Sequence, residues 1–120
     1  MTKRILVIDD DKDILAILSI IFREEGYEVI LRDTGTTAEY VQLLHPDLIL
    51  LDIQLIGSEK TGAEICRELK SHSETRRLPV ILFSAETDID ILALESKADA
   101  CISKPFEAHH LVSRVKEFLN

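Results

Sequence analysis

Five short runs of uninterrupted apolar residues recur along the chain, and they constrain the fold more than any other feature of the sequence. Runs of this kind are typical of strands that are buried on both faces of a sheet. Segments with helical spacing of apolar residues lie between them, at residues 12–25, 36–45, 60–72, 87–96 and 106–119. The apolar runs are Ile5–Ile8, Val29–Leu31, Leu48–Leu51, Val80–Phe83 and Ala100–Ile102.

Strict alternation of strands and helices predicts an α/β fold with a parallel sheet, right-handed crossovers and helices on both faces. The two weakest runs, Val29–Leu31 and Ala100–Ile102, suit the edges of that sheet. We therefore expect a doubly wound five-stranded sheet in the order 2-1-3-4-5, which is the flavodoxin-like arrangement. Gly26 follows the first helix where a left-handed residue is favoured, and Pro46 and Pro79 precede strands.

Composition limits the classes of protein that this chain can represent. A length of 120 residues without a Pro/Gly/Ser-rich linker predicts a single domain over residues 1–120. The 14 basic against 22 acidic residues give a net charge of −8, which disfavours binding to nucleic acid or to an acidic membrane. Cys66 and Cys101 lack the spacing of a metal site and suggest reduced thiols in a cytoplasmic protein. The longest apolar stretch, Ile14–Phe22, is too short to cross a bilayer.

Polar residues whose side chains can bind ligands or react follow four of the predicted strands. Asp9 and Asp10 follow the first strand, Asp52 the third, Ser84 the fourth and Lys104 the fifth. Each has a simpler interpretation as a helix cap, a turn residue or a solvated charge. However, the carboxyl ends of parallel strands share one edge of the sheet, and ligands bind there in such folds. The sequence therefore predicts one site that contains several carboxylates, a hydroxyl and an ammonium group.

The charge of this edge indicates what the site binds. Two carboxylates about 4 Å apart repel by ~4 kcal/mol at an effective dielectric constant near 20. The site therefore needs a cation in addition to Lys104. An all-oxygen site with few ligands suits Mg²⁺. The acidic loop at residues 9–13 is the opposite of the donor-rich loops that cradle phosphate. A phosphoryl group can thus enter only with the metal, and Asp52 on the central strand is best placed to attack it.

These residues closely resemble the receiver domain of two-component response regulators, over essentially the whole chain. Each motif is weak alone, but their occurrence in this order within 120 residues is highly specific. The motifs are Asp9-Asp10, Asp52 after Leu48–Leu51, Ser84-Ala85 and Lys104-Pro105-Phe106.

The resemblance implies a role for each site residue. Asp52 would accept a phosphoryl group from a sensor histidine kinase or a phosphotransfer protein. Asp10 would bind Mg²⁺ directly, Asp9 through water, and the Gln54 carbonyl would be a further ligand. Ser84 would donate a hydrogen bond to the phosphoryl oxygens.

Lys104 would pair with the phosphoryl charge, and the family's Lys-Pro bond is often cis. The protein would then be a phosphorylatable signalling switch that changes its partner binding, rather than an enzyme that turns over an external substrate.

The sequence departs from the family pattern at three places, and at one of them Lys97 replaces the usual glycine before Ala98-Asp99. Family members usually carry Pro four residues and Gly eight residues after the phosphoacceptor, where this chain has Ile56 and Lys60. The equivalent glycine is Gly62, which makes the loop 54–61 longer. The position of the family's switch aromatic residue holds Cys101.

Two other functions fit parts of the pattern. A Mg²⁺-dependent phosphohydrolase of the haloacid-dehalogenase type would use Asp9 as the nucleophile, Asp11 as the acid–base residue and Lys104 as a phosphate clamp. Lys12 and Asp13 replace the hydroxyl residues of that family, and we interpret Asp11 as a helix cap or a surface charge. A receiver-like domain that binds partners without chemistry is the other alternative, although its site residues would not need to be intact.

Overall fold

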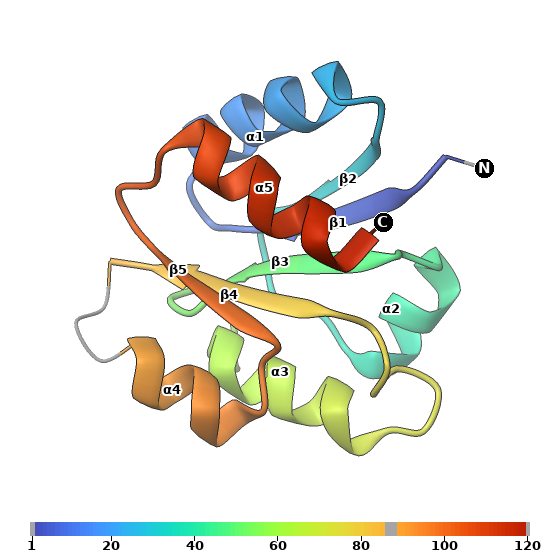
Figure 1. Cartoon of the computed structure of the whole chain (residues 1–120). Helices are drawn as coiled ribbons and strands as arrows, with labels where there is room; N and C mark the ends of the chain where they lie inside the picture. The colour runs from blue at the N-terminus through green and yellow to red at the C-terminus, as the bar shows by residue number, and fades with distance from the viewer. Residues whose placement is uncertain (1, 86–88, 120) are drawn as a thin grey trace.

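The computed structural model describes residues 2–85 and 89–119 and contains one five-stranded parallel sheet (Figure 1). The strand order is β2-β1-β3-β4-β5, so the predicted topology and both predicted edge strands are confirmed. The strands are β1 (Arg4–Ile8), β2 (Glu28–Arg32), β3 (Leu48–Asp52), β4 (Val80–Ser84) and β5 (Ala100–Ser103).

Five helices cover the sheet, with α1 and α5 on one face and α2, α3 and α4 on the other (Figure 1). Among the described residues no helix is both long and apolar enough to pass through a membrane. The helices are α1 (Lys12–Glu24), α2 (Ala38–Leu44), α3 (Gly62–Ser71), α4 (Ile89–Ser96) and α5 (Ala108–Leu119).

Three helices begin about two residues later than the apolar spacing predicted. Thr37 caps α2 by accepting from the Tyr40 N–H, and Thr61 caps α3 in a capping box with Glu64. A capping residue has extended backbone and therefore lies outside the helix that it stabilises. The expected start of α5 at residue 106 is also too early, since that helix begins at Ala108. The expected start of α4 at residue 87 lies outside the described residues.

The uninterrupted apolar runs are explained by two cores, one on each face of the sheet. In β1, Ile5 and Val7 face the core under α1 and α5, whereas Leu6 and Ile8 face the core under α2, α3 and α4. Successive side chains of a strand point to opposite faces, so both sets must be apolar when both faces are covered. The sheet is therefore buried, and its carboxyl edge remains open for polar groups.

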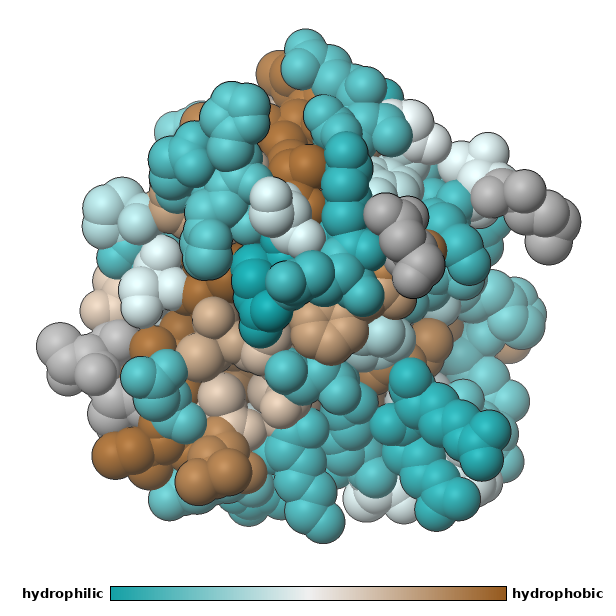
Figure 2. Space-filling view, in the orientation of Figure 1, coloured by the Kyte–Doolittle hydropathy of each residue, from teal (hydrophilic) through white to brown (hydrophobic). Residues whose placement is uncertain are grey.

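Helix α1 leaves part of its apolar surface exposed. Leu18 and Phe22 are fully buried, but the side chains of Ile17 and Ile20 are 51% and 61% exposed. Figure 2 shows apolar surface over α1 beside α5, and a further apolar patch over α4. The helix contacts β1, β2 and α5, and these contacts leave Ile17 and Ile20 on its outer side.

Gly62 fixes the path of the chain after β3. A Cβ atom at this position would overlap the main-chain carbonyl of Asp52, and the Gly62 N–H donates to the Ile53 carbonyl at 2.7 Å. Only glycine permits this close approach of α3 to the end of β3. This close contact is compatible with the expectation that Gly62 takes the place of the family glycine.

We expect Gly62→Ala to lower the free energy of unfolding by about 2 to 4 kcal/mol, since backbone must move to accept the methyl group. Gly57→Ala is the matched control, because Gly57 has a positive φ of 86° but open space around its Cα. That control should cost only about 1 kcal/mol, the penalty for a left-handed alanine. Chemical denaturation of both variants measures the difference, and equal losses would contradict the close contact.

Candidate functional site

Three carboxylates meet at the carboxyl edge of the sheet. Asp9 follows β1 and Asp52 ends β3, and these strands are neighbours in the sheet. One oxygen from each of Asp9, Asp10 and Asp52 lies within 4.8 Å of the others. Asp9 is fully buried, Asp52 is 4% exposed and Asp10 is half-buried. The sheet topology thus gathers the predicted acidic residues in one place.

Lys104 provides the positive charge among these carboxylates. Its ammonium nitrogen lies 2.9 Å from Asp9 Oδ2 and 3.4 Å from Asp52 Oδ2. The same nitrogen lies 4.6 Å from the centroid of the Phe83 ring, where a cation is also favoured. The Lys104–Pro105 peptide bond is cis, as the resemblance implied.

Ser84 ends β4 and is buried beside the carboxylates. Its carbonyl accepts a hydrogen bond from the Lys104 N–H at 2.9 Å, which ties the ends of β4 and β5 together. Predicted site residues therefore come from four strands and surround one cavity of about 250 Å³. The cavity is lined by Asp9, Asp10, Asp11, Asp52, Gln54, Ser84, Ala85 and Lys104.

A backbone N–H orients each of the three carboxylates. The Asp11 N–H donates to Asp9 Oδ1 at 2.8 Å, and the Gln54 N–H donates to Asp52 Oδ1 at 3.4 Å. The Ile56 N–H donates to Asp10 Oδ2 at 3.2 Å and crosses from the β3–α3 loop to the β1–α1 loop.

The contact from the Ile56 N–H was not predicted from the sequence. The available signal was the absence of proline at this position, because proline has no N–H to donate.

The electrostatics of the site centre on Asp52. Burial raises the pKa of this carboxyl, and the charge of Asp9 raises it further, while Lys104 and the Gln54 N–H lower it, which leaves the pKa at about 7. One ammonium group therefore does not compensate both buried carboxylates. A hard divalent cation with oxygen ligands fits this donor set and its excess negative charge.

Asp11 lies at the rim of the cavity but serves the helix. Its carboxylate accepts from the Asp13 N–H at 2.9 Å and from the Ile14 N–H at 3.4 Å, which makes it the N-cap of α1. The interpretation of Asp11 as a helix cap is confirmed. This role leaves the acid–base function of the phosphohydrolase alternative without structural support.

The sequence model of the response regulator receiver domain matches residues 5–116. The chain belongs to this family. Receiver domains act in two-component signalling, so this receiver domain is a component of a signalling switch.

Individual relatives agree with this assignment. The DNA-binding response regulator MtrA of Mycolicibacterium paratuberculosis is 42% identical over 119 residues, which cover 97% of this chain and 51% of MtrA. The receiver domain thus spans about half the length of the curated relatives that it matches.

Solved structures show the same fold. A putative response regulator from Chloroflexus aurantiacus superposes with a TM-score of 0.86 at 30% identity and covers 99% of this chain and 98% of its own. The receiver domain of NtrX from Brucella abortus gives 0.83 at 30% identity, covering 96% of this chain and 97% of its own.

Cys101, which the resemblance places at the position of the switch aromatic residue, lies on β5. Its thiol donates to Asp90 Oδ1 at 2.9 Å, and therefore joins β5 to the first turn of α4. Burial and the Asp90 carboxylate raise the pKa of the Cys101 thiol to about 11. Cys66 is fully buried, and burial raises its thiol pKa as well. Both cysteines are therefore thiols at neutral pH.

The pKa of Asp52 predicts how the stability of the metal-free protein varies with pH. The folded pKa of about 7 lies above the ordinary value of 3.8, so unfolded chains ionise first as the pH rises. The contribution of the protonated Asp52 carboxyl to the free energy of unfolding is therefore fully present below pH 3.8. It is lost as the pH rises through 7.

Asp52→Asn should therefore stabilise the metal-free protein by about 2 to 4 kcal/mol at pH 8 and by much less at pH 5. Thermal melts in chelator across this range measure the effect. Asp33→Asn removes an exposed carboxylate of the same charge and should show no such trend. A stability gain for Asp52→Asn that does not depend on pH would contradict the pKa.

Proposed function

We propose that Asp52 is the phosphoacceptor of this receiver domain. The observation that carries the proposal is the position of its carboxylate, which lies at the end of the central strand β3 and close to both buried Asp9 and the Lys104 ammonium group. Asp9 is a poorer nucleophile, because it is fully buried and is held by shorter hydrogen bonds. Lys104 and the Asp11 N–H donate to its oxygens at 2.9 and 2.8 Å, whereas both donors to Asp52 lie at 3.4 Å.

The donor is a phosphohistidine of a sensor histidine kinase or of a phosphotransfer protein. An Asp52 oxygen attacks the phosphorus atom, the N–P bond breaks, and its electron pair returns to the imidazole of the donor. Lys104 Nζ, at 3.4 Å from Asp52 Oδ2, is placed to pair with the phosphoryl charge. Ser84, which lines the same cavity, is placed to donate its hydroxyl to a phosphoryl oxygen.

Asp9, Asp10, Asp52 and the Gln54 carbonyl would hold Mg²⁺, with Asp9 acting through water. When bound, Mg²⁺ offsets the negative charge of the carboxylates and of the phosphoryl oxygens. The raised pKa of Asp52 and the three converging carboxylates support this assignment. The chain itself orients the carboxylates through the N–H groups of Asp11, Gln54 and Ile56.

We propose that this domain is a switch and has no turnover activity on external substrates. Residues 1–120 would form a single cytoplasmic domain and would not contact DNA themselves, because their net charge of −8 repels phosphates. The MtrA relatives are named as DNA-binding, so the earlier expectation of no nucleic-acid partner is restricted to these 120 residues.

An apolar groove beside the site suits the phosphodonor. It has a volume of about 630 Å³ and is formed by α1 and by the segment from β5 to α5. Ala85 and Lys104 line both this groove and the acidic cavity, so a helix docked there would lie next to Asp52. The half-exposed side chain of Ile17 extends the groove along α1.

Acetyl phosphate with Mg²⁺ should label the protein, and Asp52→Asn should abolish the label. Asp10→Asn should lower the rate by at least about tenfold, as expected for the loss of a metal ligand. Retention on phosphate-affinity gels measures labelling. Labelling that is undiminished in chelator, or in Asp52→Asn, would contradict the proposal.

The haloacid-dehalogenase alternative predicts a different result in the same samples. It requires multiple-turnover hydrolysis of a small phosphomonoester and its loss in Asp9→Asn. We expect no turnover of p-nitrophenyl phosphate above the background rate.

Ile17→Ser should slow phosphotransfer from a phosphorylated histidine phosphotransfer protein about tenfold, because one apolar contact at an interface is lost. It should leave labelling by acetyl phosphate unchanged, since Ile17 lies outside the acidic cavity. Leu94→Ser on α4, with a side chain that is 81% exposed, is the matched control and should transfer normally. Equal rates for both variants would place the docking surface elsewhere.

A further inference from the structure

The contact between the Ile56 N–H and Asp10 differs from the other two that orient the carboxylates. The donors to Asp9 and Asp52 lie two residues along the chain from the acceptor, whereas Ile56 and Asp10 are 46 residues apart. The contact therefore depends on how the loop between β3 and α3 folds back over the site. Asp10 is also the most exposed of the three carboxylates, so packing restrains it least.

The side chain of Ile56 contributes little to the fold. It is 82% exposed, and neither apolar core includes it. Its peptide N–H is the part of the residue that reaches the site. The contact with Asp10 therefore depends on the backbone N–H at position 56, which any residue except proline could supply.

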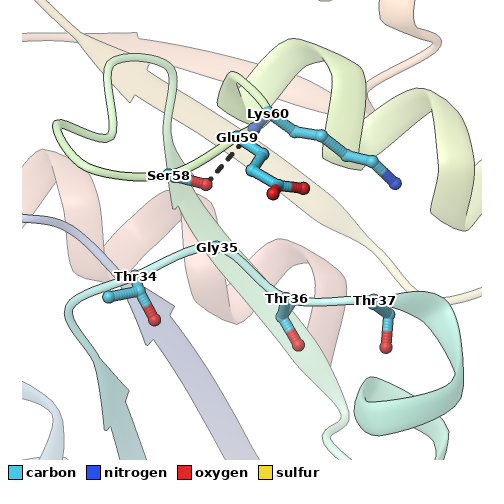
Figure 3. Close-up of a pocket in the computed structure, with 7 residues that line it drawn as sticks. All are labelled: Thr34, Gly35, Thr36, Thr37, Ser58, Glu59 and Lys60. Atoms are coloured by element: carbon cyan, nitrogen blue, oxygen red, sulfur yellow. Dashed lines mark hydrogen bonds between the residues drawn. The ribbon is translucent and has the colours of Figure 1, made fainter.

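The residues that follow Ile56 in the loop contact other parts of the fold. Gly57 takes a positive φ of 86°, and the Ser58 N–H donates to the Leu55 carbonyl at 3.0 Å, so the chain turns sharply there. Ser58 then packs against Gly35 of the β2–α2 loop, where a Cβ atom would overlap the Ser58 hydroxyl (Figure 3). The Lys60 N–H donates to the same hydroxyl at 3.4 Å.

An ion pair completes the attachment of the loop. The Lys60 ammonium group pairs with Glu68 of α3, and the other Glu68 oxygen accepts from the Ala38 N–H of α2 at 2.8 Å. These contacts raise the pKa of Lys60 and lower that of Glu68. The loop is therefore fixed to α2 and α3 at one end and contacts Asp10 at the other.

We propose that the Ile56 peptide N–H is a positioning group, which holds the Asp10 carboxylate in the pose that binds the divalent cation. The longer loop, anchored through Lys60 and Glu68, presents this N–H. The inference rests on the proposed function, in which Asp10 is a metal ligand. A carboxylate that is already oriented loses less side-chain freedom when it binds a cation, so the contact increases affinity.

Ile56→Pro and Ile56→Ala form the decisive pair of variants. Both remove the exposed side chain, but only proline removes the N–H. Isothermal titration calorimetry with MgCl₂ should give an unchanged Kd for Ile56→Ala and a Kd about fivefold or more higher for Ile56→Pro. Melts in chelator should show that Ile56→Pro remains folded, because its side chain lies outside both cores.

A second pair tests the anchor without changing the loop backbone near Asp10. Lys60→Met and Lys116→Met each remove one lysine from a surface ion pair, with Glu68 and Glu25 respectively. Loss of a positive charge alone would favour cation binding, so a weaker Mg²⁺ affinity in Lys60→Met indicates loss of positioning. We expect the Kd to rise about two- to threefold in Lys60→Met and not to rise in Lys116→Met.

The outcomes separate this inference from the function on which it rests. Mg²⁺ binding by the wild type, with equal Kd values for Ile56→Pro and Ile56→Ala, would overturn the positioning role and leave the proposed function intact. Absence of Mg²⁺ binding by the wild type would overturn both. If Ile56→Pro fails to fold, equal Kd values for Lys60→Met and Lys116→Met overturn the inference.

Discussion

Mutual repulsion of buried carboxylates is the constraint on which the site depends. Asp9 and Asp52 lie buried at the ends of the adjacent strands β1 and β3. The Lys104 ammonium group contacts both carboxylates, but its single charge does not neutralise both. The repulsion disfavours the ionised form of Asp52, and burial together with the charge of Asp9 raises its pKa to about 7. A cation relieves this repulsion, so ligand binding and the stability of the domain are linked.

The two cores make such a site possible. A sheet that is apolar on both faces is held by the packing of α1 and α5 on one side and of α2, α3 and α4 on the other. Polar groups are then confined to the edge where the strands end. Backbone N–H groups in the loops orient the carboxylates there, and the β3–α3 loop adds a contact to Asp10 that spans the site.

The sequence was sufficient to predict the topology and most of the site, because both follow from strand order. Residues that follow parallel strands must meet at one edge, and Asp9, Asp52 and Lys104 do so. The starts of α2 and α3 were predicted two residues too early, because Thr37 and Thr61 are N-caps that lie just outside these helices. The exposure of Ile17 and the contact from the Ile56 N–H depend on tertiary packing and loop path, which apolar periodicity does not encode.

The most direct test is to locate the phosphoryl group itself. Borohydride reduces an aspartyl phosphate to homoserine, so mass spectrometry of peptides from acetyl phosphate-treated protein identifies the modified residue. We expect homoserine at position 52 alone, formed with Mg²⁺ and absent in chelator. Homoserine at position 9, or at no position in a protein that binds Mg²⁺, would contradict the assignment of Asp52 as the phosphoacceptor.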